Sequence, residues 1–121
     1  MFNMGRQPAT VESVRKIIQD DLAECDDKQL EVFKRYAIEA YLAPIHRYGK
    51  MDKVVVVARN GNEVIYWEDV EEGFNVSPTD IDGRILDHWC NQDNLGFALN
   101  AWIAERKETS PIRVGPAERI E

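Results

Sequence analysis

The sequence lacks the long apolar runs and the paired cysteines that mark several classes of protein. No apolar run approaches the roughly 20 residues needed to span a bilayer, and the opening MFNMGRQPAT has no apolar core of the kind found in signal peptides. Cys25 and Cys90 stand alone without a CxxC spacing, so we expect free thiols rather than a disulfide framework or a zinc knuckle. These absences predict a cytoplasmic protein that does not act in a membrane.

Motifs for nucleotides, serine hydrolases and calcium are missing or incomplete. The sequence has no phosphate-cradling glycine loop, no GxSxG elbow and no dinucleotide fingerprint. The segment DIDGRI has the central acids and glycine of a calcium-binding loop, but the first and last ligand positions would be Pro78 and Trp89, which supply no carboxylate. We expect an aspartate-stabilised turn in its place, and neither a metal nor a cofactor in the protein.

His88 and Cys90 raise the question of a thiol nucleophile with its base. In the strand predicted for this segment, residues two apart share a face at about 7 Å, which is too far for the hydrogen bond that activates a thiol. At a helix entrance the Cys90 thiolate would gain from the helix N-terminus, and His46 could approach from a connector. These three residues are the catalytic candidates, and ordinary packing is the alternative for each. With Cys25 they also lack the paired short spacings of a zinc site.

The net charge of −7 is concentrated in one part of the chain. Residues 60–95 contain nine Asp and Glu against the single base Arg84, whereas residues 1–59 contain ten bases against nine acids, and residues 96–121 contain four of each. An acidic surface repels phosphate backbones, so we expect no nucleic-acid binding through this face. A basic partner is its physical complement, and a solvated face that keeps the protein soluble is the alternative.

The first part of the chain has the apolar spacing of two amphipathic helices. Thr10 offers an N-cap hydroxyl to the first helix, and Asp26 with a glutamine three residues later has the pattern of a capping box for the second. Apolar residues at helical spacing continue as far as Tyr41, and Pro44 should end that helix. Residues 45–50 are then predicted to form a short connector.

The middle of the chain changes to the alternating pattern of strands. KVVVVAR is apolar on both faces, which is typical of an interior strand, and the Asn-Gly pair after it predicts a tight hairpin turn. The returning strand EVIYWED would place Val64 and Tyr66 on one face and Ile65 and Trp67 on the other. FNVS is predicted as a third strand, and RILDHW (84–89) as a fourth.

The predicted architecture is α+β: two N-terminal helices, a four-stranded antiparallel meander sheet and a C-terminal helix packed on the sheet. Asp93 or Asn91 can cap that last helix. With 44% hydrophobic and 31% charged residues, the 121-residue chain is expected to form one core. We expect a flexible leader at 1–9, a single domain at 10–107 and a polar, mobile tail at 108–121.

Two functions fit these observations. The leading hypothesis is a small acidic interaction or regulatory module without catalysis, which binds a basic protein surface or self-associates. Its predicted binding residues are seven carboxylates of the acidic segment and two aromatic anchors: Glu68, Asp69, Glu71, Glu72, Asp80, Asp82, Asp87, Trp67 and Trp89. The alternative is a small-ligand-binding protein or an enzyme with a pocket around His88 and Cys90.

Overall fold

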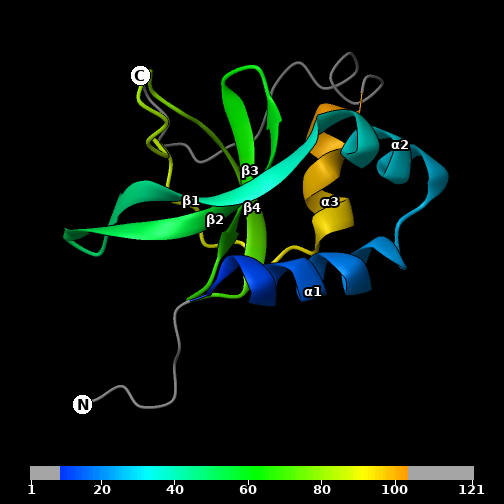
Figure 1. Ribbon diagram of the computed structural model, residues 1–121, viewed down its shortest axis with the longest axis horizontal. Coiled ribbons are helices and arrows are strands. Elements are labelled where there is room, and N and C mark those ends of the chain that lie inside the picture. Colours follow the sequence, from blue (N-terminus) through cyan, green and yellow to red (C-terminus); the bar gives the residue numbers. More distant parts are fainter. Residues whose placement is uncertain (1–8, 104–121) are drawn as a thin grey trace.

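The computed structural model describes residues 9–103, so the predicted tail and nearly all of the predicted leader lie outside the described residues. Three helices and a four-stranded antiparallel sheet follow one another along the chain (Figure 1): α1 (Val11–Leu22), α2 (Asp27–Tyr36), β1 (Ala37–Arg47), β2 (Lys50–Asn60), β3 (Glu63–Glu68), β4 (Gly73–Pro78) and α3 (Leu95–Leu99), which a short 3₁₀ helix (Asn100–Trp102) extends. The strand order is β1-β2-β3-β4. The predicted α+β architecture, with a meander sheet and helices at both ends, is confirmed.

Local capping signals determine where the first two helices begin. The Thr10 hydroxyl accepts a hydrogen bond from the Ser13 amide at 3.0 Å at the start of α1. Asp26 accepts from the Gln29 amide at 2.8 Å at the start of α2, and the Gln29 side chain accepts from the Asp26 amide at 2.8 Å. Each contact satisfies an amide that the first turn of a helix leaves without a partner. Both predicted caps are confirmed.

The predicted extension of the second helix to Tyr41 is wrong, because α2 ends at Tyr36 and the next residues form β1. This segment pairs with the valine-rich β2 along its length, and that long-range pairing outweighs the local helical spacing. Pro44 lies within β1 rather than ending a helix. Its carbonyl faces the outer edge, where it accepts from the Ile85 amide at 2.9 Å, so the missing proline amide interrupts no bond to β2.

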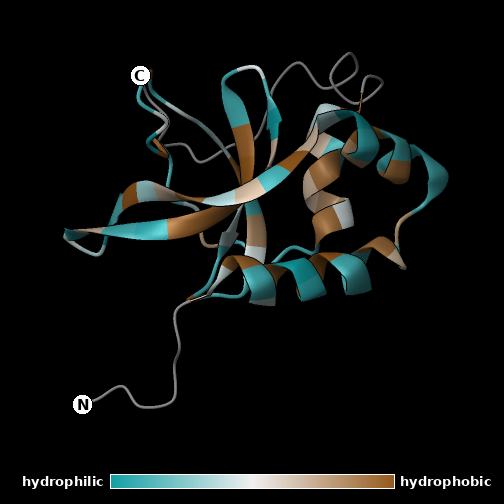
Figure 2. Ribbon diagram, in the orientation of Figure 1, coloured by the Kyte–Doolittle hydropathy of each residue, from teal (hydrophilic) through white to brown (hydrophobic). Residues whose placement is uncertain are grey.

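The sheet has a hydrophobic cluster on each face. One cluster packs against the three helices and includes Val55, Val57, Ile65 and Phe74. The other lies on the opposite face, called the second face below. It contains residues of β1, β2 and β3 together with Ile85 from the segment after β4: Ala43, Ile45, Val54, Val56, Val64, Tyr66 and Ile85. Hydrophobic colour accordingly fills the middle of β2 in Figure 2, and the predicted division of β3 between two faces is confirmed.

The segment predicted as a fourth strand, 84–89, does not extend the sheet. Ile85 forms isolated bridges with Thr79 and with Ile45, so the chain crosses the second face from the end of β4 to the edge of β1. The Tyr66 hydroxyl holds this crossing, because it accepts from the Trp89 amide at 2.8 Å and donates to the Asp87 carbonyl at 3.1 Å. The bridges at Ile85 and the bonds of the Tyr66 hydroxyl thus take the place of the continuous strand pairing that the alternating pattern suggested.

Two details of the turns also differ from prediction. The β2–β3 hairpin is confirmed, but its two loop residues are Gly61 and Asn62, and Gly61 has the positive φ of 66° that a tight turn requires. The N-cap of α3 is Asn94, whose side chain accepts from the Phe97 amide at 2.8 Å. The predicted caps Asp93 and Asn91 are therefore wrong by one and three positions.

Candidate functional site

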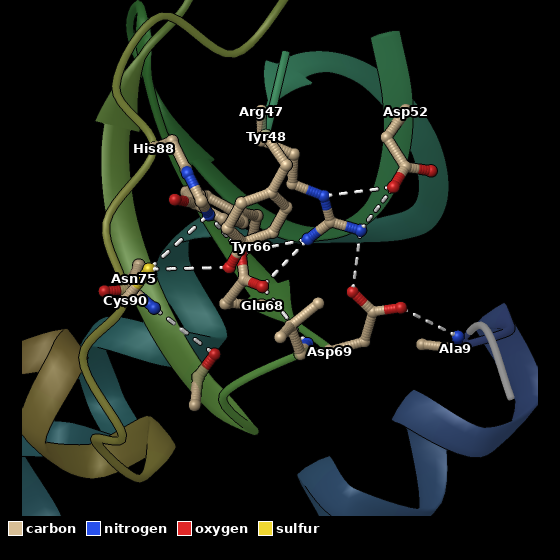
Figure 3. Close-up of polar contacts among 12 residues, drawn as sticks. Ala9, Arg47, Tyr48, Asp52, Tyr66, Glu68, Asp69, Asn75, His88 and Cys90 are labelled. Carbon is tan, nitrogen blue, oxygen red and sulfur yellow. Dashed lines mark hydrogen bonds and ion pairs between the residues drawn. The ribbon is translucent and has the colours of Figure 1, made fainter. Parts of the chain in front are cut away.

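A buried arginine lies at the end of β1 among three carboxylates (Figure 3). Arg47 follows Ala43 and Ile45 on the second face of the sheet. Its Nη1 donates to both carboxylate oxygens of Glu68 at 2.8 and 3.0 Å, and its Nη2 donates to Asp52 and Asp69 at 2.9 Å each. The side chains of Arg47 and Glu68 are 1% and 0% exposed. We call these four residues the Arg47 cluster: Arg47, Asp52, Glu68 and Asp69.

The carboxylates keep the buried guanidinium charged. Burial by itself lowers the pKa of Arg47, but the hydrogen bonds to Asp52 and Asp69 and the negative charges around it outweigh burial and raise that pKa. Burial likewise favours a higher pKa for Asp52, yet the Lys53 amide and the Arg47 guanidinium hold it below its usual value. The cluster thus sets one guanidinium against three carboxyl groups.

The sequence did not predict this cluster, although its pattern indicated one of the two central partners, Glu68. The alternation that buries Val64 and Tyr66 on one face of β3 continues to Glu68, so a carboxylate was to be expected on a buried face. Its partner was hidden, because Arg47 fell in the predicted connector and not on a strand. Only the pairing of β1 with β2 brings Arg47 to the same end of the sheet as Glu68.

His88 and Cys90 do meet, contrary to the 7 Å separation expected on a strand. Nε2 of His88 lies 3.0 Å from Glu68 Oε1 and 3.6 Å from the Cys90 sulfur (Figure 3). The Tyr48 hydroxyl lies 3.9 Å from the same sulfur, and its ring meets the imidazole edge-on with centroids 5.0 Å apart. Burial, the contact with Cys90 and nearby negative charges raise the pKa of Tyr48 to about 12. His46 is exposed and does not join the group.

The shared nitrogen determines what His88 can do for the thiol. Both oxygens of Glu68 accept N–H groups of the Arg47 guanidinium, so this carboxylate acts as a hydrogen-bond acceptor in the cluster. The Nε2 atom therefore carries the hydrogen that points to Glu68 Oε1. A nitrogen that already carries a hydrogen cannot take the Cys90 proton, so this contact is no base–nucleophile pair.

The predicted binding carboxylates fall into different environments. Glu68 and Asp69 point into the Arg47 cluster, and Asp69 also accepts from the Ala9 amide at 3.3 Å. Glu71 and Glu72 lie on the β3–β4 turn, where Glu72 is exposed and Glu71 is half-buried. The acidic segment is therefore divided between an inward-facing pair and carboxylates that face solvent.

The remaining predicted carboxylates lie on the crossing segment. Asp80 accepts from the amides of Asp82 and Arg84 at 2.9 Å each, and its side chain is 3.2 Å from the Arg84 guanidinium. The Arg84 amide, with these other contacts, lowers the pKa of Asp80. This is the aspartate-stabilised turn expected for DIDGRI. Asp82 is exposed and Asp87 is half-buried.

The two predicted aromatic anchors are only partly accessible. Trp67 packs on Phe74 with ring centroids 4.9 Å apart, at the border of the helix-side core, and Trp89 is also half-buried. Among residues 9–103, the aromatic side chains that are mostly exposed are Tyr48, at 59%, and Phe97, at 60%. Phe97 lies between the buried positions Leu95 and Ala98 on α3. The helical spacing of the apolar residues leaves Phe97 off the buried face of this helix, and that spacing was the signal in the sequence that its side chain would be exposed.

Comparisons with known proteins add no family. No family model matches the sequence, and searches against curated proteins and solved structures found no match. Within residues 9–103, no three histidine, cysteine or acidic side chains are placed to share a metal ion. Over the same residues, no helix is long and apolar enough to cross a membrane.

Proposed function

We propose that this protein is a small acidic cytoplasmic interaction module without catalysis, which binds a basic surface on another protein or on a second copy of itself. The observation that carries the proposal is the distribution of charge. Residues 9–103 contain eighteen acids and ten bases, a net charge of −8. One of those bases, Arg47, is buried among carboxylates, and Arg84, the only base of residues 60–95, is held by Asp80.

An unbalanced acidic surface favours association with a cationic partner. Long-range attraction raises the rate of encounter and orients the partner, while like charges reject anionic competitors such as nucleic acids. Glu72 and Asp82 are exposed carboxylates of the segment, and neither has a basic partner within the described residues. They are the residues through which such attraction would act first.

The Arg47 cluster supports a structural role for the buried charges. Every buried side-chain nitrogen and oxygen among residues 9–103 has a hydrogen-bond partner. Catalytic and ligand sites commonly keep polar groups open for their substrate, whereas this cluster satisfies its own. The acids at its centre hold the end of β1 against the end of β3.

The test is to identify the partner and measure how salt affects its binding. Tagged protein would capture partners from its native host, and binding of the purified pair would then be measured at about 50 mM and about 500 mM salt, where the screening length falls from about 14 Å to about 4 Å. We expect a basic partner and a marked loss of affinity at the higher salt. An affinity that is the same at both concentrations contradicts the proposal.

A second candidate function is thiol chemistry at Cys90, which the 3.6 Å contact with His88 favours. The sulfur is exposed and adjoins an imidazole, a neighbour that reactive cysteines commonly have. In a Cys25→Ser background, this function requires that iodoacetamide alkylate folded Cys90 faster than the same thiol in the unfolded chain at equal pH. An equal or slower rate in the folded protein removes this candidate.

A further inference from the structure

A small cavity opens where the end of α1 and the starts of α2 and α3 meet, at the end of the molecule where the three helices gather (Figure 1). Its volume is about 190 Å³. It is lined by two carboxylates, two amides, a thiol and an aromatic residue: Asp21, Glu24, Gln29, Asn94, Cys25 and Phe97. Sites for small molecules usually enclose about 300–1,000 Å³, so this cavity, the acidic pocket, suits a single side chain better than a free ligand.

The acidic pocket is lined by two carboxylates and, among residues 9–103, by no basic residue. Burial is the largest cause of the raised pKa of the Cys25 thiol, and burial by itself disfavours a cation as well. The negative charges of Asp21, Asp26 and Glu24 raise that pKa further, and these charges favour a cation.

Hydrogen bonds hold the walls of the pocket in place. Asp21 accepts from the Leu95 amide at 2.8 Å, which fixes α1 to the start of α3. Gln29 donates to the Gly96 carbonyl at 3.1 Å and to Asn100 Oδ1 at 3.2 Å, which fixes α2 to the same helix. The pocket therefore exists before any ligand arrives, and little ordering is required on binding.

Two carboxylates and one aromatic ring are left to meet a partner. Asp21 uses its Oδ2 atom for the Leu95 amide, and the exposed Glu24 carboxylate forms no hydrogen bond or ion pair with residues 9–103. Phe97 is 60% exposed, while its helix neighbours Leu95 and Ala98 are buried. An aromatic side chain beside carboxylates offers a surface for the aliphatic stem of a lysine or arginine, and acceptors for its charged end.

We infer that the acidic pocket receives a lysine or arginine side chain from the basic partner protein. The inference rests on the proposed function and identifies a point of contact for it. The pocket also lies near the acidic segment identified in the sequence, because Asn94 comes two residues after Gln92, whose side-chain amide donates to Glu71 at 3.5 Å. A basic residue in the pocket would thus place neighbouring partner residues beside the carboxylates of the β3–β4 turn.

The test uses defined probes in place of the unidentified partner. ¹⁵N-labelled protein would be titrated with N-acetyl-arginine methylamide, and separately with the uncharged isostere N-acetyl-citrulline methylamide, while amide resonances are followed by NMR. We expect saturable shifts at Glu24, Cys25, Gly96 and Phe97 with the arginine probe. The citrulline probe should bind at least about tenfold more weakly, because it lacks the charge that the carboxylates recognise.

Matched variants test whether the pocket is responsible. Glu24→Gln should weaken arginine binding about fivefold, the effect of one exposed ion pair, and Phe97→Ser should weaken it independently. Glu12→Gln also removes one exposed carboxylate, but in the first turn of α1, at the end of that helix away from the pocket, and should change nothing. Unchanged amide resonances elsewhere in the spectrum would show that each variant is folded.

Three results overturn the inference: equal binding of both probes, equal loss in Glu12→Gln and Glu24→Gln, or no saturable shift up to about 20 mM probe. Two further outcomes distinguish a failure of this inference from a failure of the proposed function. If binding of the natural partner depends on salt but survives Glu24→Gln, the pocket is wrong and the function stands. If binding of the partner is indifferent to salt, the proposed function itself is wrong.

Discussion

The Arg47 cluster and the acidic pocket both gather carboxylates, but only one of them contains a cation. In the cluster, Arg47 donates to three carboxylates from a fully buried position, and the bonds join β1 to β3. In the pocket, Asp21 and Glu24 face a cavity that no described basic residue lines. A count of acidic residues along a sequence thus combines two kinds: carboxylates paired with a buried cation, and carboxylates with no basic partner among the described residues.

This difference separates a structural role from a binding role. A buried charge that loses its partner is strongly destabilising, so the cluster is expected to matter for folding. An exposed carboxylate without a partner contributes little to stability, and its charge remains available to another molecule. Substitutions in the Arg47 cluster should therefore lower the free energy of unfolding, whereas substitutions in the acidic pocket should leave it nearly unchanged.

The largest effect is expected for Arg47→Met. The substitution keeps an apolar stem but leaves Glu68 fully buried without its counter-ion, and breaking a buried pair in this way costs about 3–5 kcal/mol. The free energy of unfolding, measured with urea, should fall by that amount. Lys53→Met, an exposed change of the same kind on β2, should stay within about 0.5 kcal/mol of the wild type. A similar loss of unfolding free energy in both variants would show that the Arg47 cluster does not stabilise the fold more than an exposed residue does.

A smaller effect is expected for Tyr66→Phe, which removes the hydroxyl that holds the crossing segment. The Trp89 amide would lose its 2.8 Å acceptor, and an unsatisfied polar group of this kind costs about 1–3 kcal/mol. Urea unfolding should show the loss. Tyr41→Phe is the control, because its half-buried hydroxyl accepts from the Arg59 side chain and has no other partner among residues 9–103. If the control loses as much stability, the crossing segment does not depend on this hydroxyl.

The same contrast explains how much of the molecule could be predicted from its sequence. The caps at Thr10 and Asp26 and the β2–β3 hairpin depend on residues within a few positions of one another, and all were found. Strand β1 depends on pairing with β2, and a local helical spacing concealed it. The Arg47 cluster could not be predicted without β1, because it joins Arg47 to Glu68, 21 residues further along the chain. The His88–Cys90 contact could not be predicted because the segment was assumed to be a strand, in which these side chains would be too far apart.

Acid should weaken the cluster through Asp52. Its pKa is lowered in the folded state, so its contribution to stability is complete above the unfolded value of about 3.9 and is lost as pH falls through the lower, folded value. Asp52→Asn should be less stable than the wild type above that range, and the two curves should converge as pH falls. Urea unfolding over a pH series measures this. Asp82→Asn is an exposed change, so its curve of unfolding free energy against pH should run parallel to that of the wild type. If these two curves also converge as pH falls, the effect is one of overall charge and not of the cluster.

The smallest effect on stability is expected in the acidic pocket. Glu24→Gln should leave the free energy of unfolding within about 0.5 kcal/mol of the wild type, because the exposed carboxylate has no partner among the described residues. The same substitution should be visible at Cys25. Glu24 is one of the charges that raise the pKa of this thiol, so its removal should increase the thiolate fraction and the rate of alkylation by iodoacetamide in a Cys90→Ser background. Glu12→Gln should not change that rate. A Glu24→Gln variant that is markedly less stable, or an alkylation rate of Cys25 that does not change in it, would contradict this prediction. The pocket would then be a structural element like the Arg47 cluster, whose charges are paired within the protein.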